Sequence, residues 1–307
     1  MIDVCLLGTG GMMPLPGRWL SSVLVRVQGR MLLLDCGEGT QISQKQVGWG
    51  FRPLEAICLS HLHADHVSGL VGMLLMLANS DRTEAVTLYG PVRLEAVVEG
   101  QRRIAPYLPF PLRCVELRGG ERFEAAGLRA RALPADHAVP CLAYRFDLPR
   151  ARRFNADRAL ALEVPREQWK RLQAGQPVEW NGQRVEPRQV LGERRAGLSL
   201  GYATDTRPTP RMPIFFRGVD LLICEGTYGD DAQLERALER KHMTFSEAAT
   251  LARDARVGAL WLTHFSPALE RPADFLGNAQ RIFPDTVVGE DHLQTTLRFD
   301  WRQAQAT

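Results

Sequence analysis

A dense histidine cluster in the first quarter of the chain offers the clearest chemistry in the sequence. His61, His63 and His66 lie within six residues, together with Asp65, directly after the apolar run 56–59. A metal ion can satisfy the ring nitrogens of several buried imidazoles at once. His61 and His63 alternate as at a strand end and can bind one ion, whereas Asp65 and His66, past a bend, point toward a second. We interpret the segment as a metal-binding turn; the alternative is a cluster satisfied by hydrogen bonds alone.

Possible ligands recur later in the chain, each just after an apolar run. They are His137 after 128–133, Asp205 after 198–203, Glu225 after 221–224 and His264 after 259–263. Proteins built on sheets tend to place their sites at such strand ends. The potential metal ligands number seven, namely His61, His63, Asp65, His66, His137, Asp205 and His264.

Seven ligands are too many for one tetrahedral zinc ion, so the set predicts two ions. They fit if Asp205 bridges both, with His61, His63 and His137 completing one site and Asp65, His66 and His264 the other. Imidazole-rich ligation without thiolates favours zinc, and manganese is also possible.

The elements that must position these side chains alternate between strands and helices. We expect strands at 2–7, 23–28, 31–34 and 86–89, and helices at 38–47, at 68–78 and beginning near Pro91. The chain has 307 residues, of which 45% are hydrophobic, enough to bury a substantial core. The pattern predicts an α/β protein.

Cysteine usage and the lack of targeting signals predict a cytoplasmic location. The six cysteines are scattered, without a Cys-x-x-Cys pair, and we expect buried free thiols in a reducing compartment. No basic, cleavable leader precedes the first apolar strand. The longest apolar stretch, around 72–78, is too short to cross a bilayer, so we expect no membrane partner.

Five motifs, in this order, resemble the metallo-β-lactamase superfamily and, within it, the ribonuclease Z family. They are Asp-Cys-Gly-Glu-Gly-Thr at 35–40, His-Leu-His-Ala-Asp-His at 61–66, His137, Asp-Thr at 205–206 and Thr-His-Phe-Ser at 263–266. The resemblance spans nearly the whole chain and implies an αββα sandwich of two mixed sheets in a single domain, 1–307, with the dinuclear site at one rim. It also implies that Asp35 hydrogen-bonds the ligand turn; a turn-capping role is the alternative.

The resemblance implies a zinc-dependent phosphodiesterase that removes the 3′ trailer of precursor tRNA. A hydroxide shared by two zinc ions per subunit would attack the scissile phosphate, leaving a tRNA 3′-hydroxyl and a trailer 5′-phosphate. Asp65 would orient that hydroxide. His242, oriented by Glu225, would act on the departing 3′ oxygen, because segments 224–227 and 242–244 match family segments that supply a carboxylate and a histidine. Alternatively, His242 only marks the beginning of a helix.

A basic insertion separates two of the expected strands. Segment 147–197 holds eleven Arg or Lys and seven Asp or Glu, net +4, and leaves net −1 for the rest of the chain. Such a protrusion on a nearly neutral body suits phosphate-backbone binding, with a solvated insertion as the alternative. Family members carry a tRNA-binding arm at this position and form homodimers, although the Gly-Pro motif usual in their arms is missing here. The RNA contacts we expect are Arg152, Arg153, Lys170 and Arg171.

The loop 14–19 matches a family loop that reads the tRNA 3′ end only at Pro14 and Arg18. Arg18 could hold a phosphate through two hydrogen bonds, and Trp19 could stack on a base or pack inside. His292 has no assigned role.

Two other functions stay open: a small-molecule or cyclic-nucleotide phosphodiesterase or other hydrolase on the same fold, and a catalytically dead RNA-binding module.

Overall fold

Two mixed β-sheets form the framework of the protein. The computed structural model describes residues 1–299. Within these residues the first sheet has seven strands, in the order β16, β1, β2, β3, β4, β5, β6. Their bounds are β1 (Ile2–Gly8), β2 (Ser22–Val27), β3 (Arg30–Leu34), β4 (Leu54–Cys58), β5 (Val86–Pro91), β6 (Leu112–Leu117) and β16 (Gln294–Leu297). Pairing is antiparallel from β16 to β3 and parallel from β3 to β6.

The second sheet also has seven strands among the described residues, in the order β15, β14, β13, β12, β9, β8, β7. Their bounds are β7 (Arg122–Ala125), β8 (Leu128–Ala135), β9 (Cys141–Arg150), β12 (Arg195–Ala203), β13 (Leu221–Glu225), β14 (Ala259–Thr263) and β15 (Thr286–Val288). Strands β12 to β15 pair in parallel, whereas β7, β8 and β9 pair antiparallel. The carboxyl ends of the parallel strands meet at one edge, where the predicted ligands follow them.

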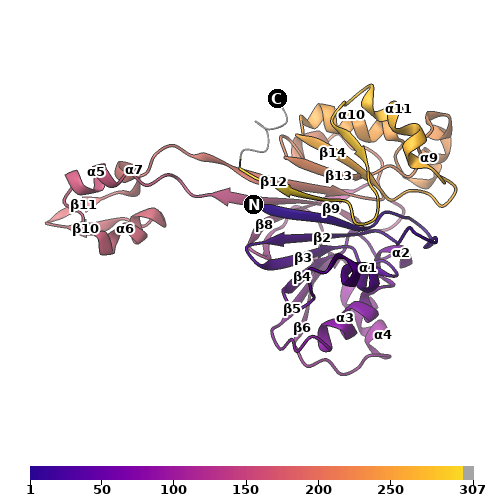
Figure 1. The fold of residues 1–307 in the computed structure, drawn as a ribbon, viewed down its shortest axis with the longest axis horizontal. Coiled ribbons are helices and arrows are strands. Elements are labelled where there is room, and N and C mark those ends of the chain that lie inside the picture. The colour runs from indigo at the N-terminus through magenta and orange to yellow at the C-terminus, as the bar shows by residue number, and fades with distance from the viewer. Residues whose placement is uncertain (300–307) are drawn as a thin grey trace. The chain divides into compact units, whose positions relative to one another are not determined.

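Helices cover the outer face of each sheet (Figure 1). Those near the first sheet are α1 (Thr40–Val47), α2 (Ala64–Val67), α3 (Leu70–Ala78) and α4 (Leu94–Arg102). Those near the second sheet are α8 (Met212–Phe215), the 3₁₀ helices η1 (Asp231–Gln233) and η2 (Pro272–Phe275), α9 (Leu234–Arg240), α10 (Phe245–Ala255) and α11 (Leu276–Gln280).

The two sheets also meet each other through buried contacts. The Tyr144 hydroxyl on β9 donates to the Leu59 carbonyl just after β4 at 2.7 Å. The Leu142 N–H donates to the Ser60 carbonyl at 2.9 Å. Apolar side chains fill the space between each sheet and its helices. This layering confirms the predicted αββα sandwich of two mixed sheets.

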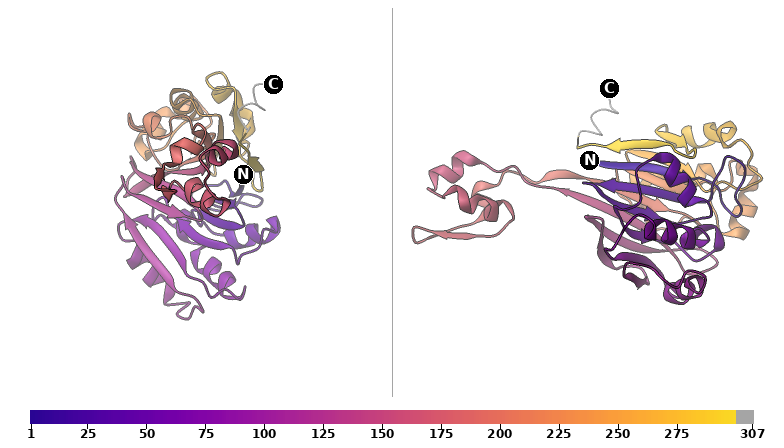
Figure 2. Two further views of the ribbon diagram at one scale, coloured as in Figure 1. Left: turned by 90° about the vertical axis from the view of Figure 1, so that its left-hand side faces the viewer. Right: turned by 60° about the horizontal axis from the view of Figure 1, so that its bottom comes forward.

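The first and last strands of the described chain are neighbours in the first sheet. Figure 2 shows the yellow strand β16 beside the indigo strand β1, and the pairing runs from Ile2 opposite Leu297 to Cys5 opposite Gln294. The loop that precedes β16 therefore reaches the same end of the sheet as the loop that follows β1.

Most predicted elements are present, with shifted ends. The helices expected at 38–47 and 68–78 begin at Thr40 and Leu70. Strand β5 continues through Pro91, so the following helix begins only at Leu94. The strands that flank the basic insertion reach Arg150 and begin again at Arg195, because β9 and β12 are neighbours in the sheet.

Contacts divide the chain into two compact units. One comprises Met1–Asp147 and the chain from Leu198, and the other is Leu148–Gly197. The smaller unit contains α5 (Ala156–Ala161), α6 (Arg166–Gln173), α7 (Pro187–Val190) and a hairpin of β10 (Val178–Trp180) and β11 (Gln183–Val185). It has its own apolar core, formed by Ala159, Val164, Leu172, Val178, Val185, Val190 and Leu191.

All six cysteines are unpaired, and five are buried, the exception being the half-buried Cys114. Within residues 1–299, no helix combines the length and apolar character needed to span a membrane.

Candidate metal centre

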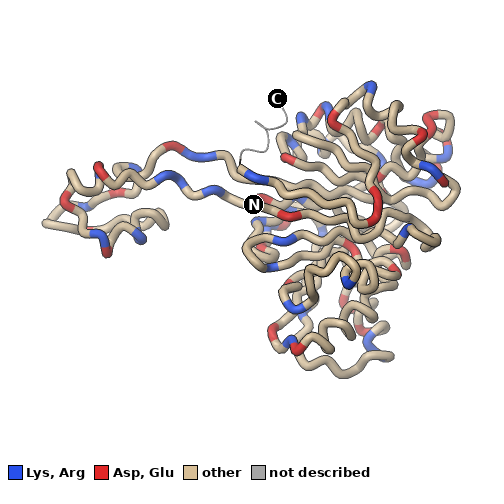
Figure 3. Tube along the Cα trace, viewed as in Figure 1, with Lys and Arg blue, Asp and Glu red and all other residues tan. Residues whose placement is uncertain are grey.

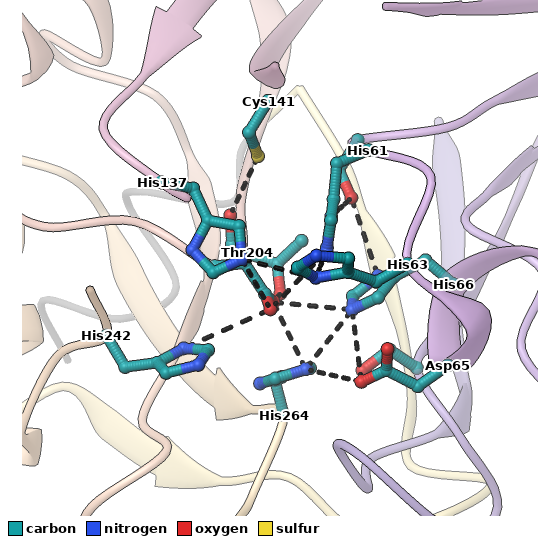
Figure 4. A network of polar contacts seen from close by, with 12 residues as sticks. His61, His63, Asp65, His66, His137, Cys141, Thr204, His242 and His264 are labelled. Carbon is teal, nitrogen blue, oxygen red and sulfur yellow. Dashed lines mark hydrogen bonds and ion pairs between the residues drawn. The ribbon is translucent and has the colours of Figure 1, made fainter. Parts of the chain in front are cut away.

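The predicted ligands converge at the edge where strands of both sheets end. His61 and His63 follow β4, and Asp65 and His66 lie on α2. Their partners come from the second sheet, with His137 after β8, Asp205 after β12 and His264 after β14. Figure 4 shows the labelled imidazoles directed toward a common centre.

The ligand atoms form two groups. In the first, His61, His63, His137 and Asp205 offer atoms that all lie within 4.8 Å of one another. In the second, Asp65, His66 and His264 do the same. The structure thus brings together all seven residues, in the two sets that the sequence predicted.

Asp205 stands between the groups, and each of its oxygens faces one of them. Its Oδ2 lies 3.6 Å from His61 Nε2 and 3.8 Å from His137 Nε2. Its Oδ1 lies 3.3 Å from His66 Nε2 and 3.1 Å from His264 Nε2. A carboxylate placed in this way could offer one oxygen to an ion in each group.

The spacing of the donor atoms fits metal coordination. Ligands about 2.05 Å from a tetrahedral zinc ion lie roughly 3.3 Å apart. His63 Nδ1 lies 3.0 Å from His61 Nε2 and 3.3 Å from His137 Nε2. In the second group, His264 Nε2 is 3.2 Å from His66 Nε2 and 3.4 Å from Asp65 Oδ2. Donor chemistry and distances therefore both fit divalent metal binding.

The protonation states of the predicted ligands also favour binding of a cation. Burial lowers the pKa of His61 and of His137, so both imidazoles are neutral. Burial alone would raise the pKa of Asp205, but His264, His66 and His61 outweigh it and hold that pKa well below its usual range. Burial would likewise lower the pKa of His66, but Asp205 and Asp35 raise it. The negative charge that raises the pKa of His66 also attracts a divalent cation.

Asp35 contacts His66 of the second group through the imidazole nitrogen Nδ1. Its Oδ2 accepts from the Tyr202 hydroxyl at 2.7 Å and lies 2.8 Å from His66 Nδ1. Ser60 donates to the same carboxylate through its backbone N–H at 2.6 Å and its hydroxyl at 2.8 Å. A carboxylate on Nδ1 fixes the imidazole so that Nε2 faces the ion.

Sequence reasoning gave no role to Ser60 or Tyr202. Ser60 adjoins the histidine turn, but serine there has no distinctive signal. Tyr202 lies inside an apolar strand and is indistinguishable by sequence from a core residue. Only the packing of the two sheets places its hydroxyl on Asp35.

The loop after β1 closes over the second group. The Met12 N–H donates to Asp65 Oδ2 at 2.7 Å. At Gly11 a Cβ atom would lie 2.6 Å from Cε1 of His264, far inside contact distance. The loop can approach the histidine this closely only because residue 11 is glycine.

His242 and Glu225 form an adjacent pair. Glu225 is fully buried, and its oxygens lie 3.2 and 3.3 Å from His242 Nδ1. The carboxylate also accepts the N–H groups of Thr206 at 2.6 Å and Met243 at 3.0 Å. Burial alone would lower the pKa of His242, but Glu225 outweighs it and raises that pKa to about 9.

His242 also lies close to the predicted ligands. Its Nδ1 is 4.0 Å from Asp205 Oδ2, and it forms a third group of potential ligands with Asp205 and His264. Thr227, which sequence reasoning did not single out, links these elements. Its hydroxyl donates to Glu225 at 2.6 Å and lies 3.1 Å from His264 Nδ1.

The residues of the predicted 3′-end loop make contacts within the protein. Arg18 donates from its two terminal nitrogens to the carbonyls of Leu269 and Glu270, each at 2.9 Å. Each of these nitrogens carries a second hydrogen, so a phosphate could bind Arg18 only through the remaining N–H groups of the guanidinium. The Trp19 ring packs over Gly39, where a Cβ atom would lie 2.1 Å from it.

His292 lies two residues before β16 and makes structural contacts. Its N–H donates to the Leu6 carbonyl at 2.7 Å, and its Nε2 lies 2.9 Å from Ser43 Oγ. The neighbouring Asp291 accepts from the Thr9 hydroxyl at 2.8 Å and the Trp19 N–H at 2.6 Å.

The unit Leu148–Gly197 carries eleven Arg or Lys and six Asp or Glu. Figure 3 shows the basic positions, in blue, recurring along it. Arg153, Lys170 and Arg171 are exposed. Arg152 is half-buried and donates to the Gly192 carbonyl at 2.6 Å, so it stabilises the unit itself.

Comparisons with known proteins identify the family of the chain. The β-lactamase superfamily domain matches residues 30–265. A ribonuclease Z from Lachnospira eligens is 47% identical over 301 residues, covering 98% of this chain and 99% of that protein. A ribonuclease Z from Clostridioides difficile is 42% identical over 304 residues, covering 98% and 100%.

Solved structures show the same fold. The crystal structure of the short form of human tRNase Z has a TM-score of 0.69 at 23% identity, covering 96% of this chain and 99% of that one. A metallo-β-lactamase fold protein from Bacillus subtilis has a TM-score of 0.68 at 18% identity, covering 96% and 100%.

Proposed function

Since the chain belongs to the ribonuclease Z family of the β-lactamase superfamily, we propose that it is a metal-dependent endoribonuclease that removes the 3′ trailer of precursor tRNA. The observation that carries the proposal is the Asp205 carboxylate, whose two oxygens each face one of two imidazole groups. A paired site of this kind suits phosphodiester hydrolysis, in which charge develops on both the attacking and the departing oxygen.

The proposed cofactor is two zinc ions per subunit, with manganese as the alternative. Asp205 would contribute to both sites, His61, His63 and His137 would complete the first, and Asp65, His66 and His264 would complete the second. When bound, such ions supply an activated water and neutralise charge on the phosphate. Asp35 stays outside both sites and orients His66 through Nδ1.

Asp65 orients the attacking water. Its Oδ2 is fixed by the Met12 N–H and by the neighbouring imidazole of His264. Hydrogen bonds from His264 and His66 outweigh the effect of burial and lower the pKa of Asp65, so the carboxylate is an anion that accepts a hydrogen bond from the water and orients it, while the proton lost by the water passes to solvent.

His242 protonates the departing oxygen. Glu225 holds its Nδ1, and the raised pKa keeps the ring protonated near neutral pH. Its Nε2 has no hydrogen-bond partner among the described residues and can donate to the substrate. As water attacks phosphorus and the P–O3′ bond breaks, the proton passes to O3′, which leaves a 3′-hydroxyl on the tRNA and a 5′-phosphate on the trailer.

The unit Leu148–Gly197 binds the tRNA body through the phosphate backbone. The exposed side chains of Arg153, Lys170 and Arg171 are the expected contacts. The remaining chain forms one catalytic domain, into which this unit is inserted. We further expect a cytoplasmic homodimer, on the basis of the resemblance described above.

The test is cleavage of a precursor tRNA with a 3′ trailer by zinc-loaded protein, mapped at nucleotide resolution. We expect one cut after the discriminator base, with a trailer that becomes a substrate for a 5′-phosphate-dependent exonuclease. The Asp205→Ala variant should lose the cut, whereas Asp254→Ala, which removes an exposed carboxylate, should keep it. Failure to cut any precursor, with bis(p-nitrophenyl) phosphate still hydrolysed, would instead favour a small-molecule phosphodiesterase.

A further inference from the structure

Arg207 connects the three loops that carry His137, Asp205 and His242. It lies two residues after Asp205, and its N–H donates to the carbonyl of Asp136, the neighbour of His137, at 3.0 Å. Its guanidinium donates to the carbonyl of His242. One residue, through its backbone N–H and its side chain, therefore ties the proposed proton donor to the loops of two proposed metal ligands.

Glu247 holds the guanidinium in place. Arg207 donates to both oxygens of the Glu247 carboxylate, one of them at 2.9 Å. The arginine side chain is 13% exposed and the glutamate 22%. A paired contact of this kind fixes the plane of the guanidinium as well as its position.

Glu247 is itself fixed to the beginning of α10. It accepts the Thr244 N–H at 3.0 Å, and its own N–H donates to the Thr244 hydroxyl at 3.3 Å. This reciprocal capping box orders the first turn of the helix. Arg207 thus joins a rigid helix end to the His242 carbonyl.

His242 needs such an anchor because it lies between two helices. Lys241, just before it, has a left-handed φ of 58° at the end of α9. The His242 N–H donates to the Ala237 carbonyl at 2.9 Å, and Glu225 contacts the ring. Among the described residues, Arg207 is the hydrogen-bond donor to the His242 carbonyl.

We propose that Arg207 is a positioning residue for His242, holding its backbone so that the ring faces the departing oxygen of the substrate. This inference rests on the proposed role of His242 as proton donor. Arg207 belongs to none of the groups of potential metal ligands, and it acts through the His242 carbonyl and Glu247.

The leaving group provides a specific readout. A ribose 3′ oxygen needs a proton as it departs, whereas p-nitrophenolate is stable without one. Loss of Arg207 should therefore slow cleavage of precursor tRNA far more than hydrolysis of bis(p-nitrophenyl) phosphate. A small misplacement of a catalytic group costs roughly 100-fold in rate.

The experiment measures single-turnover cleavage of precursor tRNA and steady-state hydrolysis of bis(p-nitrophenyl) phosphate for Arg207→Ala, Arg207→Lys, His242→Ala and the double variant R207A/H242A. We expect R207A to lower the single-turnover rate constant on tRNA about 10–100-fold with an unchanged half-saturating enzyme concentration. R207K should not restore it, because lysine cannot bind Glu247 and the carbonyl at once in the same geometry. R253A, which removes an exposed partner of Asp254, is the matched control.

The double variant decides whether Arg207 acts through His242. If it does, R207A/H242A should be no slower on tRNA than H242A alone. Additive losses, equal losses on both substrates, or a lower zinc content in R207A would overturn the inference. If H242A cleaves tRNA at the normal rate, the proposed role of His242 fails. If H242A cleaves slowly but R207A cleaves at the normal rate, only the inference about Arg207 fails.

Discussion

Replacing Tyr202 by phenylalanine should lower the affinity for the ion proposed to bind His66. The affinity for the other ion should not change. The Tyr202 hydroxyl donates to Asp35 Oδ2, and Asp35 in turn contacts His66 Nδ1. Both Tyr202 and Asp35 are fully buried, so water cannot replace the lost donor. The carboxylate keeps the two hydrogen bonds from Ser60 but gains freedom to rotate away from His66.

The expected size of the effect follows from the charge on Asp35. A hydrogen bond to a charged group contributes about 1.5–3 kcal/mol. Loss of a partner that orients a metal ligand weakens metal binding about 10–100-fold, which corresponds to roughly 1.4–2.8 kcal/mol. We therefore expect the affinity for one of the two ions to fall by about this factor.

Competition between the metal-free protein and a chromogenic zinc chelator measures the two affinities. Tyr144→Phe is the matched control, because Tyr144 is equally buried and its hydroxyl donates to the neutral Leu59 carbonyl at 2.7 Å. Y144F should lower the free energy of unfolding by about 1–3 kcal/mol, because it leaves the buried Leu59 carbonyl without a donor, and should not change zinc affinity. The reasoning is refuted if Y202F binds both ions as tightly as Y144F does, or if Y202F lowers the affinities for both ions by the same factor.

Three further predictions concern the loop over the site, the His242 pair and the basic unit. Gly11→Ala should lower the zinc content measured by mass spectrometry, because the added Cβ would overlap His264. Gly100→Ala, whose added Cβ meets nothing within 4 Å, should keep the full zinc content. Full zinc occupancy in both variants would contradict the assigned contact. In the metal-free protein, Glu225→Gln should lower the pKa of His242 from about 9, because it removes the negative charge that offsets the effect of burial on that pKa. An unchanged NMR titration of His242 would show that another group raises the pKa. Charge reversal in the basic unit should raise KM for precursor tRNA and flatten its salt dependence without affecting bis(p-nitrophenyl) phosphate, whereas an equal loss on both substrates would point to misfolding. The variant combines Arg153→Glu, Lys170→Glu and Arg171→Glu.

The positions of the predicted ligands could be read from the sequence because the signal is local. Each ligand comes just after an apolar strand, and strand ends in a layered α/β protein gather at one edge. The prediction that Asp205 lies between the two groups of ligands came from counting ligands against the capacity of one ion. The same local logic located the β2–β3 hairpin and the strands that lead to His137 and His264.

Contacts between distant segments could not be predicted in this way. Tyr202 on Asp35 and Arg207 on the His242 carbonyl depend on how the sheets and loops pack. Residue type was equally uninformative about Arg18 and Arg152. Both look like phosphate ligands in the sequence, yet each donates to backbone carbonyls of its own unit.

The connection between β9 and β12 has an evolutionary consequence. Because these strands are neighbours in the sheet, the segment between them departs and returns at adjacent positions. It also packs around its own apolar core. Insertions, deletions or wholesale exchange of Leu148–Gly197 therefore need not shift the register of the strands before His137 and Asp205. Sequence change in this unit can therefore accumulate while the positions of the predicted metal ligands stay the same.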